Sequence, residues 1–511
     1  MKNSLVAVLE IGSTGIRLIV AEIISENEWR VLDRAVRPVM LGRDVFTSGE
    51  LSRESLSECL AVLHNYRELL TGWNVADSDI HVIATSALRE ARNRNIFIDR
   101  VWQKTGFRLA IVDGVEENRL IYLAVRAALK QDFPLFWRGN SMVINIGGGS
   151  TEIMLLRRGQ MVAARSLKLG VIIIDRRTRS GGGADLSARE NALNEIIKNT
   201  MAVLKSEMDL GHVKTLVAVG WSAQLVSAYI GKELNKNCRI IEREDFVKFA
   251  EKIRYYTAEE CVQKLQISYA DAEGIISGVL VHKIFLEHTD SAQMVVPQVS
   301  IREGFLVDLS LGSSAGLQEE YFSQIIASAL SLGNKFRFDE THARHVAQLC
   351  MSLFDALEKE HGLSARHRLL LETAAILHDI GVFIKYSGHT KHGQYIVANS
   401  EIFGLHRDEL NVIANAIRYH NGPVPSEAEI EYMAMLGIDQ LLVLKMAAIL
   451  RVAEALDWGH SQRIRNIKVE LLPQSIVIHA DKTYAASVEQ IELEKKSELF
   501  LDIFGYKIIL S

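Results

Sequence analysis

Cysteine is scarce in this sequence, and the few cysteines are not spaced as metal ligands or as a disulfide framework. Four cysteines occur among 511 residues, and none of them forms a CxxC pair. This usage fits a reducing compartment and argues against a disulfide scaffold and against a cysteine-based zinc site. We expect the four thiols to be small core side chains.

Long apolar runs are lacking as well. No stretch of 18 apolar residues occurs, and the N-terminus passes directly into a strand pattern, so we expect neither a transmembrane helix nor a signal peptide. The 58 Lys and Arg residues against 63 Asp and Glu residues give a net charge of -5, which indicates neither nucleic acid nor a membrane surface as a partner. The sequence therefore predicts a cytoplasmic protein without a membrane partner and without a specific nucleic-acid partner.

The length and the residue pattern indicate several domains. A chain of 511 residues is too long for one compact core, and two to four domains are the usual solution. The best candidate for a linker is the Gly/Ser stretch Leu311–Gly316. After it, helical spacing dominates to about Ala455, and an alternating hairpin pattern follows over Ile467–Ala480.

One stretch of the first part, Met142–Arg157, predicts two strands joined by a polar turn. Its turn consists of Gly147, Gly148, Gly149, Ser150 and Thr151. Three consecutive glycines weaken an ordinary strand, but they tolerate positive φ and let the main chain approach an anion closely. The alternative is a hairpin with a flexible tip.

A similar unit occurs about 135 residues earlier, over Leu5–Ile23. Aligning Gly12 with Gly147 also aligns Glu10 with Asn145. Such a repeat predicts two related lobes, each of which offers a phosphate-binding turn to a cleft between them.

Charged residues that could act in this cleft lie between the two turns. Arg89 belongs to a helix that follows a predicted strand over residues 80–85, where it could hold an anion bidentately or lie on a solvated helix face. Glu116 and Glu117 follow a second short strand at a helix start. They could stabilise that helix through its dipole or supply a general base at the cleft, and their place between the two turns favours the base.

The helical second part contains a set of residues that could bind metal ions. Imidazole and carboxylate groups are the ligands that hydrolytic divalent metals use. The candidates are His345, His378, Asp379 and Asp457, with His392 and His420 as an extension toward a second metal.

Six motifs, in their order along the chain, resemble those of the Ppx/GppA family of exopolyphosphatases and guanosine pentaphosphate phosphohydrolases. They are TSALREARN, DGVEENRLIY, GGGSTE, SLKLG, REG and RYHNG. The resemblance covers nearly the whole chain. It implies an α/β fold of two actin-like, ribonuclease-H-like lobes over residues 1–125 and 126–310, then an all-α HD-type domain with a small α+β tail over residues 317–511.

The resemblance also implies an activity and roles for particular residues. The expected reaction is Mg²⁺-dependent release of orthophosphate from inorganic polyphosphate or guanosine pentaphosphate, by a homodimer. Glu117 would be the base, with Glu116 as the fallback, and Glu10 and Asn145 would occupy the metal-binding positions. The implied phosphate-binding residues are Ser13, Thr14, Gly15, Arg17, Arg89 and Gly147 to Thr151.

The sequence departs from the family's pattern at three places. Glu10 and Asn145 stand where the family has aspartates, and Trp221 follows Gly220 where the family often has a small turn. Losing one charge near a divalent ion removes roughly 4 kcal/mol of attraction per pair of elementary charges at 4 Å and an effective dielectric of 20, before desolvation.

These departures leave three hypotheses. The first is the phosphohydrolase, and the second is a protein with a weakened site that binds polyphosphate or an alarmone without turning it over. The third adds phosphoester hydrolysis in the HD-type domain, with Mn²⁺ or another divalent metal. The sequence does not choose between polyphosphate and the nucleotide.

Overall fold

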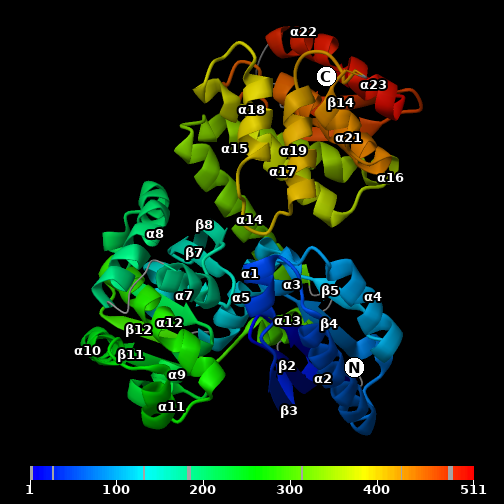
Figure 1. The fold of residues 1–511 in the computed structure, drawn as a ribbon. Helices are drawn as coiled ribbons and strands as arrows, with labels where there is room; N and C mark the ends of the chain where they lie inside the picture. Colours follow the sequence, from blue (N-terminus) through cyan, green and yellow to red (C-terminus); the bar gives the residue numbers. More distant parts are fainter. Residues whose placement is uncertain are drawn as a thin grey trace. The chain divides into compact units, whose positions relative to one another are not determined.

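The computed structural model describes residues 4–25, 28–129, 133–180, 186–311, 315–426, 428–480 and 487–511. The chain forms two compact units, one up to Glu319 and one from Glu320 to Ser511, and each is described by itself (Figure 1). Residues 312–314 of the expected linker lie outside the described residues. No described helix is both long enough and apolar enough to cross a membrane.

The first unit begins with a five-stranded sheet whose order is β3-β2-β1-β4-β5. Its strands are β1 (Ser4–Ile11), β2 (Gly15–Ser25), β3 (Glu28–Pro38), β4 (Ile80–Ala84) and β5 (Leu109–Ile111). The central strand β1 pairs antiparallel with β2 and parallel with β4, and its middle residues are buried. The parallel pairing brings the C-terminal ends of β1, β4 and β5 to the same edge, where helices begin.

Between β3 and the second sheet, the described part of the chain forms six helices. They are α1 (Leu41–Ser48), α2 (Arg53–Gly72), α3 (Ser86–Glu90), α4 (Arg94–Thr105), α5 (Gly114–Leu129) and α6 (Pro134–Arg138), with a 3₁₀ turn at Asp77–Asp79. Helix α2 begins directly after its N-cap Ser52, whose side chain accepts a hydrogen bond from the backbone N–H of Ser55 at 3.1 Å.

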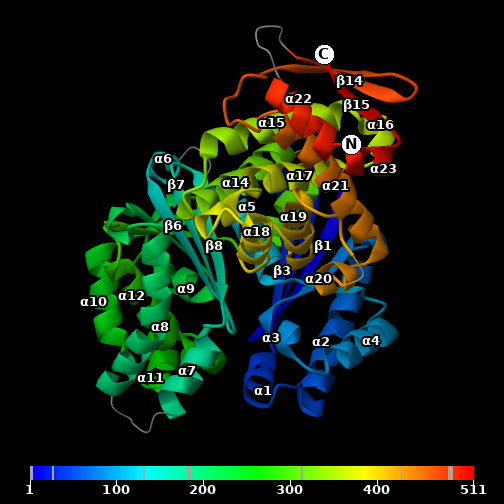
Figure 2. The same cartoon turned by 90° about the horizontal axis from the view of Figure 1, so that it is seen from above.

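A second, seven-stranded sheet has the order β10-β11-β12-β9-β6-β7-β8, and its strands β6, β7 and β8 are labelled in Figure 2. Its strands are β6 (Asn140–Ile146), β7 (Thr151–Arg157), β8 (Gln160–Leu167), β9 (Thr215–Val219), β10 (Lys232–Asn235), β11 (Cys238–Glu242) and β12 (Gln293–Pro297). The accompanying helices are α7 (Val171–Ser180), α8 (Leu186–Glu207), α9 (Trp221–Ile230), α10 (Arg243–Ile253), α11 (Ala258–Leu265) and α12 (Tyr269–Glu287), with a 3₁₀ turn at Leu210–His212.

The two hairpins predicted to be related have the same local structure. In β1–β2 the backbone N–H of Gly12 donates to the carbonyl of Gly15 at 3.0 Å, and in β6–β7 that of Gly147 donates to Ser150 at 2.9 Å. Glu10 lies opposite Arg17, and the equivalent register position in the second hairpin is the pair Asn145 and Glu152. The internal repeat read from the sequence is therefore present in the structure.

Helix α13 (Ile301–Leu311) returns the chain to the first sheet. It packs on α5 and on strands β1 to β3, although the expected ranges placed it with the second lobe. Arg119 of α5 binds Asp308 at 2.7 Å, and Arg34 of β3 binds Glu303 at 2.5 Å. Helix α5 also crosses the boundary expected at residue 125, because it runs without interruption to Leu129.

The second unit is helical and ends in a three-stranded sheet. Its helices are α15 (Glu340–Ala356), α16 (Glu358–His361), α17 (Ala365–Leu377), α18 (His389–Ala398), α19 (Arg407–Tyr419), α20 (Ile430–Met433), α21 (Gly437–Ala455), α22 (Ser487–Lys496) and α23 (Glu498–Phe504). Helix α14 (Ala315–Lys335) leads into it, and a 3₁₀ turn spans Ile380–Phe383. Strands β13 (Ile467–Leu471), β14 (Ser475–Ala480) and β15 (Lys507–Leu510) form the sheet. The expected order of mixed α/β sheets followed by a helical part is confirmed.

Candidate functional site

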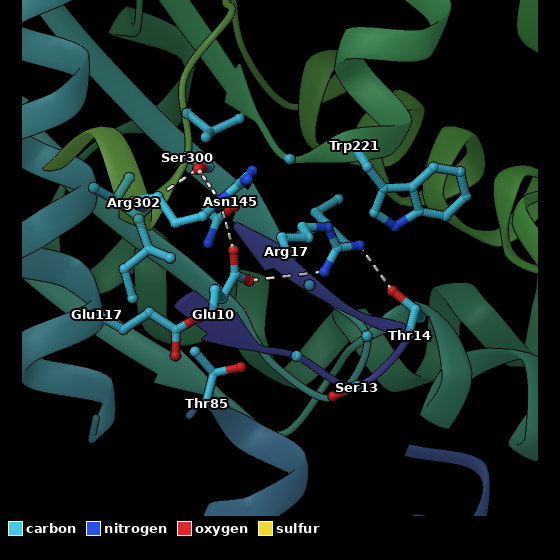
Figure 3. A pocket seen from close by; sticks show the side chains of 18 of the residues that line it. Glu10, Ser13, Thr14, Arg17, Thr85, Glu117, Asn145, Trp221, Ser300 and Arg302 are labelled. Carbon is cyan, nitrogen blue, oxygen red and sulfur yellow. Dashed lines mark hydrogen bonds and ion pairs between the residues drawn. The ribbon is translucent and has the colours of Figure 1, made fainter. Parts of the chain in front are cut away.

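A pocket in the first unit lies where the two related turns meet (Figure 3). The first hairpin lines it with Glu10, Gly12, Ser13, Thr14 and Arg17, and the second with Asn145, Ile146, Gly147 and Gly148. The pocket is partly open to solvent. Residues from both halves of the unit therefore surround a single pocket.

The glycines of the second turn allow the two halves to approach closely. A Cβ on Gly148 would lie 2.6 Å from the Cβ of Ser13, and one on Gly149 would run into the Phe46 ring. Both glycines, like Gly147, keep φ outside the left-handed region. The sequence-based expectation of positive φ is therefore wrong here, and the close approach that these glycines permit is the one between the two halves of the unit.

Glu117 lines the pocket from the first turn of α5 and is only 6% exposed. One of its oxygens lies 3.4 Å from Nη1 of Arg89, which also donates to the carbonyl of Val112 at 2.8 Å. Burial raises the pKa of Glu117 well above its ordinary value, and the negative charge of Glu152 raises it further, while Arg89 opposes the shift. Such a carboxyl group holds a proton more tightly than an exposed glutamate and is a stronger base when ionised.

Glu116 has a different environment from its neighbour. Its two oxygens bind Nε and Nη2 of Arg119 at 2.7 and 2.6 Å, and the same guanidinium binds Asp308. Glu116 is not among the residues that line the pocket. Of the two adjacent carboxylates, the one at the pocket is Glu117.

Glu10 faces two arginines across the pocket. Its Oε2 lies 3.1 Å from Nε of Arg302, and its Oε1 lies 3.8 Å from Nη1 of Arg17 (Figure 3). The side chains of Arg302 and Arg17 are 10% and 20% exposed, so these interactions are partly shielded from solvent. The pocket therefore holds two cations beside its carboxylates, as a site for a polyanion requires.

Asn145 binds a buried carboxylate that the sequence analysis did not single out. Its Nδ2 donates to Oε2 of Glu152 at 3.0 Å, and Ser166 donates to the other oxygen at 3.3 Å. Burial raises the pKa of Glu152, which has no exposed surface. Its position in the repeat, equivalent to that of Arg17, was the signal that could have identified it.

The expected phosphate-binding residues divide into two groups. Ser13, Thr14, Arg17, Gly147 and Gly148 line the pocket. Gly15, Arg89, Gly149, Ser150 and Thr151 are not among its lining residues, and the Thr151 hydroxyl instead donates to the carbonyl of Leu169. The structure adds lining residues that the sequence analysis had not assigned to the site, namely Thr85, Ser86, Trp221, Gln224, Ser300 and Arg302.

Trp221 reaches the pocket from the start of α9. The preceding Gly220 has φ +104°, and a Cβ there would lie 2.8 Å from the carbonyl oxygen of Ile146. A side chain at position 220 would therefore be strained and would clash with β6. The glycine lets the helix start beside the second turn, with the indole at the pocket wall (Figure 3).

In the second unit, possible metal ligands gather around Asp379. His342, one turn before His345 on α15, donates from Nδ1 to Oδ2 of Asp457 at 2.8 Å. Two groups of possible ligand atoms occur among the described residues of this unit, one formed by His342, Asp379 and His460 and one by Asp379, His389 and His420. Of the four predicted ligands, Asp379 belongs to both groups, whereas His345 belongs to neither.

The other two predicted ligands have distinct surroundings. Asp457 also accepts hydrogen bonds at Oδ1 from the backbone N–H groups of Ser461 and Gln462 at 3.1 and 2.7 Å. It therefore orients His342 and lies outside both ligand groups. Nε2 of His378 lies 3.6 Å from Oδ2 of Asp379 and has no hydrogen-bond partner.

Comparison with known proteins places this geometry in a family. The model of the Ppx/GppA phosphatase family matches residues 19–312, and that of Ppx/GppA phosphatase domain III matches residues 326–499. A guanosine-5'-triphosphate,3'-diphosphate pyrophosphatase of Pseudoalteromonas translucida is 25% identical over 100% of this chain and 99% of its own.

Solved structures show the same fold over part of the chain. A Ppx/GppA family member of Aquifex aeolicus is 24% identical, with a TM-score of 0.51 over 61% of this chain and 98% of its own. An exopolyphosphatase of Cytophaga hutchinsonii is 19% identical, with a TM-score of 0.54 over 60% of this chain and 98% of its own.

Proposed function

Because the chain belongs to the Ppx/GppA phosphatase family, we propose that its pocket releases orthophosphate from the end of inorganic polyphosphate or from guanosine pentaphosphate. The observation that carries this proposal is the buried Glu117 carboxyl group, which lines one pocket together with two guanidinium groups. A relative that matches the full length of the chain is named as a guanosine pentaphosphate pyrophosphatase, which supports the nucleotide as one substrate.

In the proposed reaction Glu117 acts on water. The ionised carboxylate accepts a proton from a water molecule whose oxygen attacks the terminal phosphorus. The new P–O bond forms as the P–O bond to the bridging oxygen breaks, and orthophosphate leaves while the shortened chain keeps the bridging oxygen. Arg17 and Arg302 neutralise the phosphate charge, because phosphoryl transfer depends mainly on positioning and electrostatics.

The oxygen donors of the pocket fit a hard divalent cation, and divalent-metal dependence is general in this family. Asn145 gives its Nδ2 hydrogen to Glu152, so its Oδ1 is the atom available as a ligand. Glu10 supplies a carboxylate at the equivalent position of the first hairpin. We assign these two residues to Mg²⁺, which prefers carboxylate and carbonyl oxygens and would neutralise charge on the phosphates.

The same two residues support the alternative of a weakened enzyme that mainly binds its ligand. Glu10 is ion-paired with Arg17 and Arg302, and Asn145 carries no charge. A pocket with two arginines and a single, ion-paired carboxylate at the two metal-binding positions holds polyphosphate or an alarmone through its arginines, while it binds a cation weakly. Tight ligand binding with turnover that does not respond to millimolar Mg²⁺ would favour this alternative.

The test is orthophosphate release from polyphosphate and from guanosine pentaphosphate by the full-length protein. We expect Glu117→Gln to lower kcat by about 10²- to 10⁴-fold, which is the usual contribution of a positioned base. Glu116→Gln is the matched control, because it removes an adjacent carboxylate that binds Arg119 outside the pocket. Equal losses in both variants, or none in either, would contradict the assignment of Glu117.

Four further assignments belong to this proposal. The two sheets of the first unit correspond to actin-like lobes, and the helical unit corresponds to an HD-type domain that could carry a second, phosphoester-hydrolysing activity. All four cysteines are buried and none of them is in a disulfide, in keeping with the cytoplasm. We also expect a homodimer, which sedimentation of the full-length protein would test.

A further inference from the structure

Three histidines of the second unit are held in the same tautomer. His378, His389 and His420 each place Nδ1 within 2.7, 3.0 and 2.6 Å of the backbone carbonyl oxygen three residues earlier. A carbonyl only accepts hydrogen bonds, so Nδ1 carries the proton in each ring. Nε2 of each neutral imidazole then presents a lone pair, which is the form that binds metal ions.

These lone pairs converge on one carboxylate. Nε2 of His389 lies 3.4 Å from Nε2 of His420, and Oδ1 of Asp379 lies 3.4 and 3.9 Å from these two atoms. Three acceptors without a proton between them repel one another unless a cation lies among them. The point equidistant from the three atoms is about 2.1 Å from each, which is the length of a Zn–N or Zn–O bond.

We propose that Asp379, His389 and His420 bind one divalent transition-metal ion in the second unit. His389 and His420 are buried, and the side chain of Asp379 is 25% exposed, which leaves a route from solvent. Two imidazole ligands favour Zn²⁺, Mn²⁺ or Fe²⁺ over Mg²⁺, which prefers oxygen ligands. Three protein ligands leave room for water or a phosphate oxygen, as in catalytic rather than structural metal sites.

The surroundings are arranged to hold a second ion beside the first. His342, Asp379 and His460 form the second group of ligand atoms, so Asp379 is common to both groups and could bridge two ions. Asp457 binds Nδ1 of the buried His342, and Nε2 of the same ring has no hydrogen-bond partner. A carboxylate that fixes the far nitrogen of an imidazole is the usual support of a histidine ligand.

The test measures metal content directly. The full-length protein is stripped with a chelator, loaded with Zn²⁺, Mn²⁺ or Mg²⁺, desalted and analysed by mass spectrometry for metal per chain. We expect about one or two Zn²⁺ or Mn²⁺ ions per chain and no retained Mg²⁺. His389→Gln should lower the affinity at least tenfold, whereas the matched control His392→Gln, on the same helix but outside both ligand groups, should not.

Two further measurements test the metal site without relying on the folding of a variant of that site, and separate it from the pocket of the first unit. Co²⁺ titrated into the wild-type protein should give visible absorption bands of nitrogen-ligated cobalt, and this needs no variant. Glu117→Gln should lose phosphate release but keep the metal, which separates this proposal from the proposed function. A wild-type protein that retains less than a tenth of an ion per chain, or His389→Gln with unchanged metal content, would overturn the site.

Discussion

Two charged neighbours of Glu117 should shift the pH dependence of activity in opposite directions when each is removed. Arg89, 3.4 Å away, lowers the pKa of Glu117, whereas the negative charge of Glu152 raises it. A general base acts in its ionised form, so kcat/KM falls as the pH drops through the pKa of Glu117. Arg89→Gln should therefore move this acid limb to higher pH, and Glu152→Gln should move it to lower pH.

The size of each shift follows from distance and burial. An opposite charge within 4 to 6 Å lowers a carboxyl pKa by about 1 to 3 units. The guanidinium of Arg89 is 19% exposed and Glu117 is nearly buried, so solvent screens the pair only in part. We expect Arg89→Gln to move the acid limb up by about 1 to 3 pH units and Glu152→Gln to move it down by about 1 unit or more.

The assay is kcat/KM for orthophosphate release measured from about pH 4 to pH 10, at saturating divalent metal. Arg89→Lys keeps the positive charge and serves as the control, and thermal melting shows that each variant is folded. Shifts of both variants in the same direction would refute the electrostatic reasoning. An acid limb that stays in place in both variants would show that another group limits activity at low pH.

Three other substitutions test the pocket. Asn145→Asp adds a carboxylate and should lower the Mg²⁺ concentration for half-maximal activity about tenfold, measured by metal titration. Gly148→Ala places a methyl group 2.6 Å from the Cβ of Ser13, so we expect a loss of about 1 to 3 kcal/mol of stability in denaturant unfolding. Arg302→Gln frees Glu10 from its shortest ion pair and should raise KM for polyphosphate more than it lowers kcat.

The repeat could be predicted because it depends on local pattern. Glycine turns, strand lengths and the polar residues at fixed offsets were enough to align Glu10 with Asn145, and the carboxylate pair at a helix start was enough to make Glu116 and Glu117 the candidates for a base. The choice between Glu116 and Glu117 from sequence came from the family resemblance. The structure supplies a physical reason, because Arg119 binds Glu116 outside the pocket.

What the sequence did not predict depends on tertiary packing. His342 and His345 lie one helical turn apart, so sequence spacing does not show which of them meets a carboxylate contributed by a distant helix end. Glu152 is followed directly by apolar residues in a buried strand, and only its contact with Asn145 shows its importance. The role of the glycines in letting Ser13 approach Gly148 likewise depends on contact between two halves of the unit.

The most direct test of the central claim is hydrolysis in water labelled with ¹⁸O. If a water molecule activated by Glu117 attacks the terminal phosphorus, each orthophosphate released from polyphosphate or guanosine pentaphosphate carries one labelled oxygen, and Glu117→Gln releases almost none. Label in the remaining chain or nucleotide would show attack at an inner phosphorus. Unchanged labelled orthophosphate from Glu117→Gln would contradict the role of Glu117 as the base.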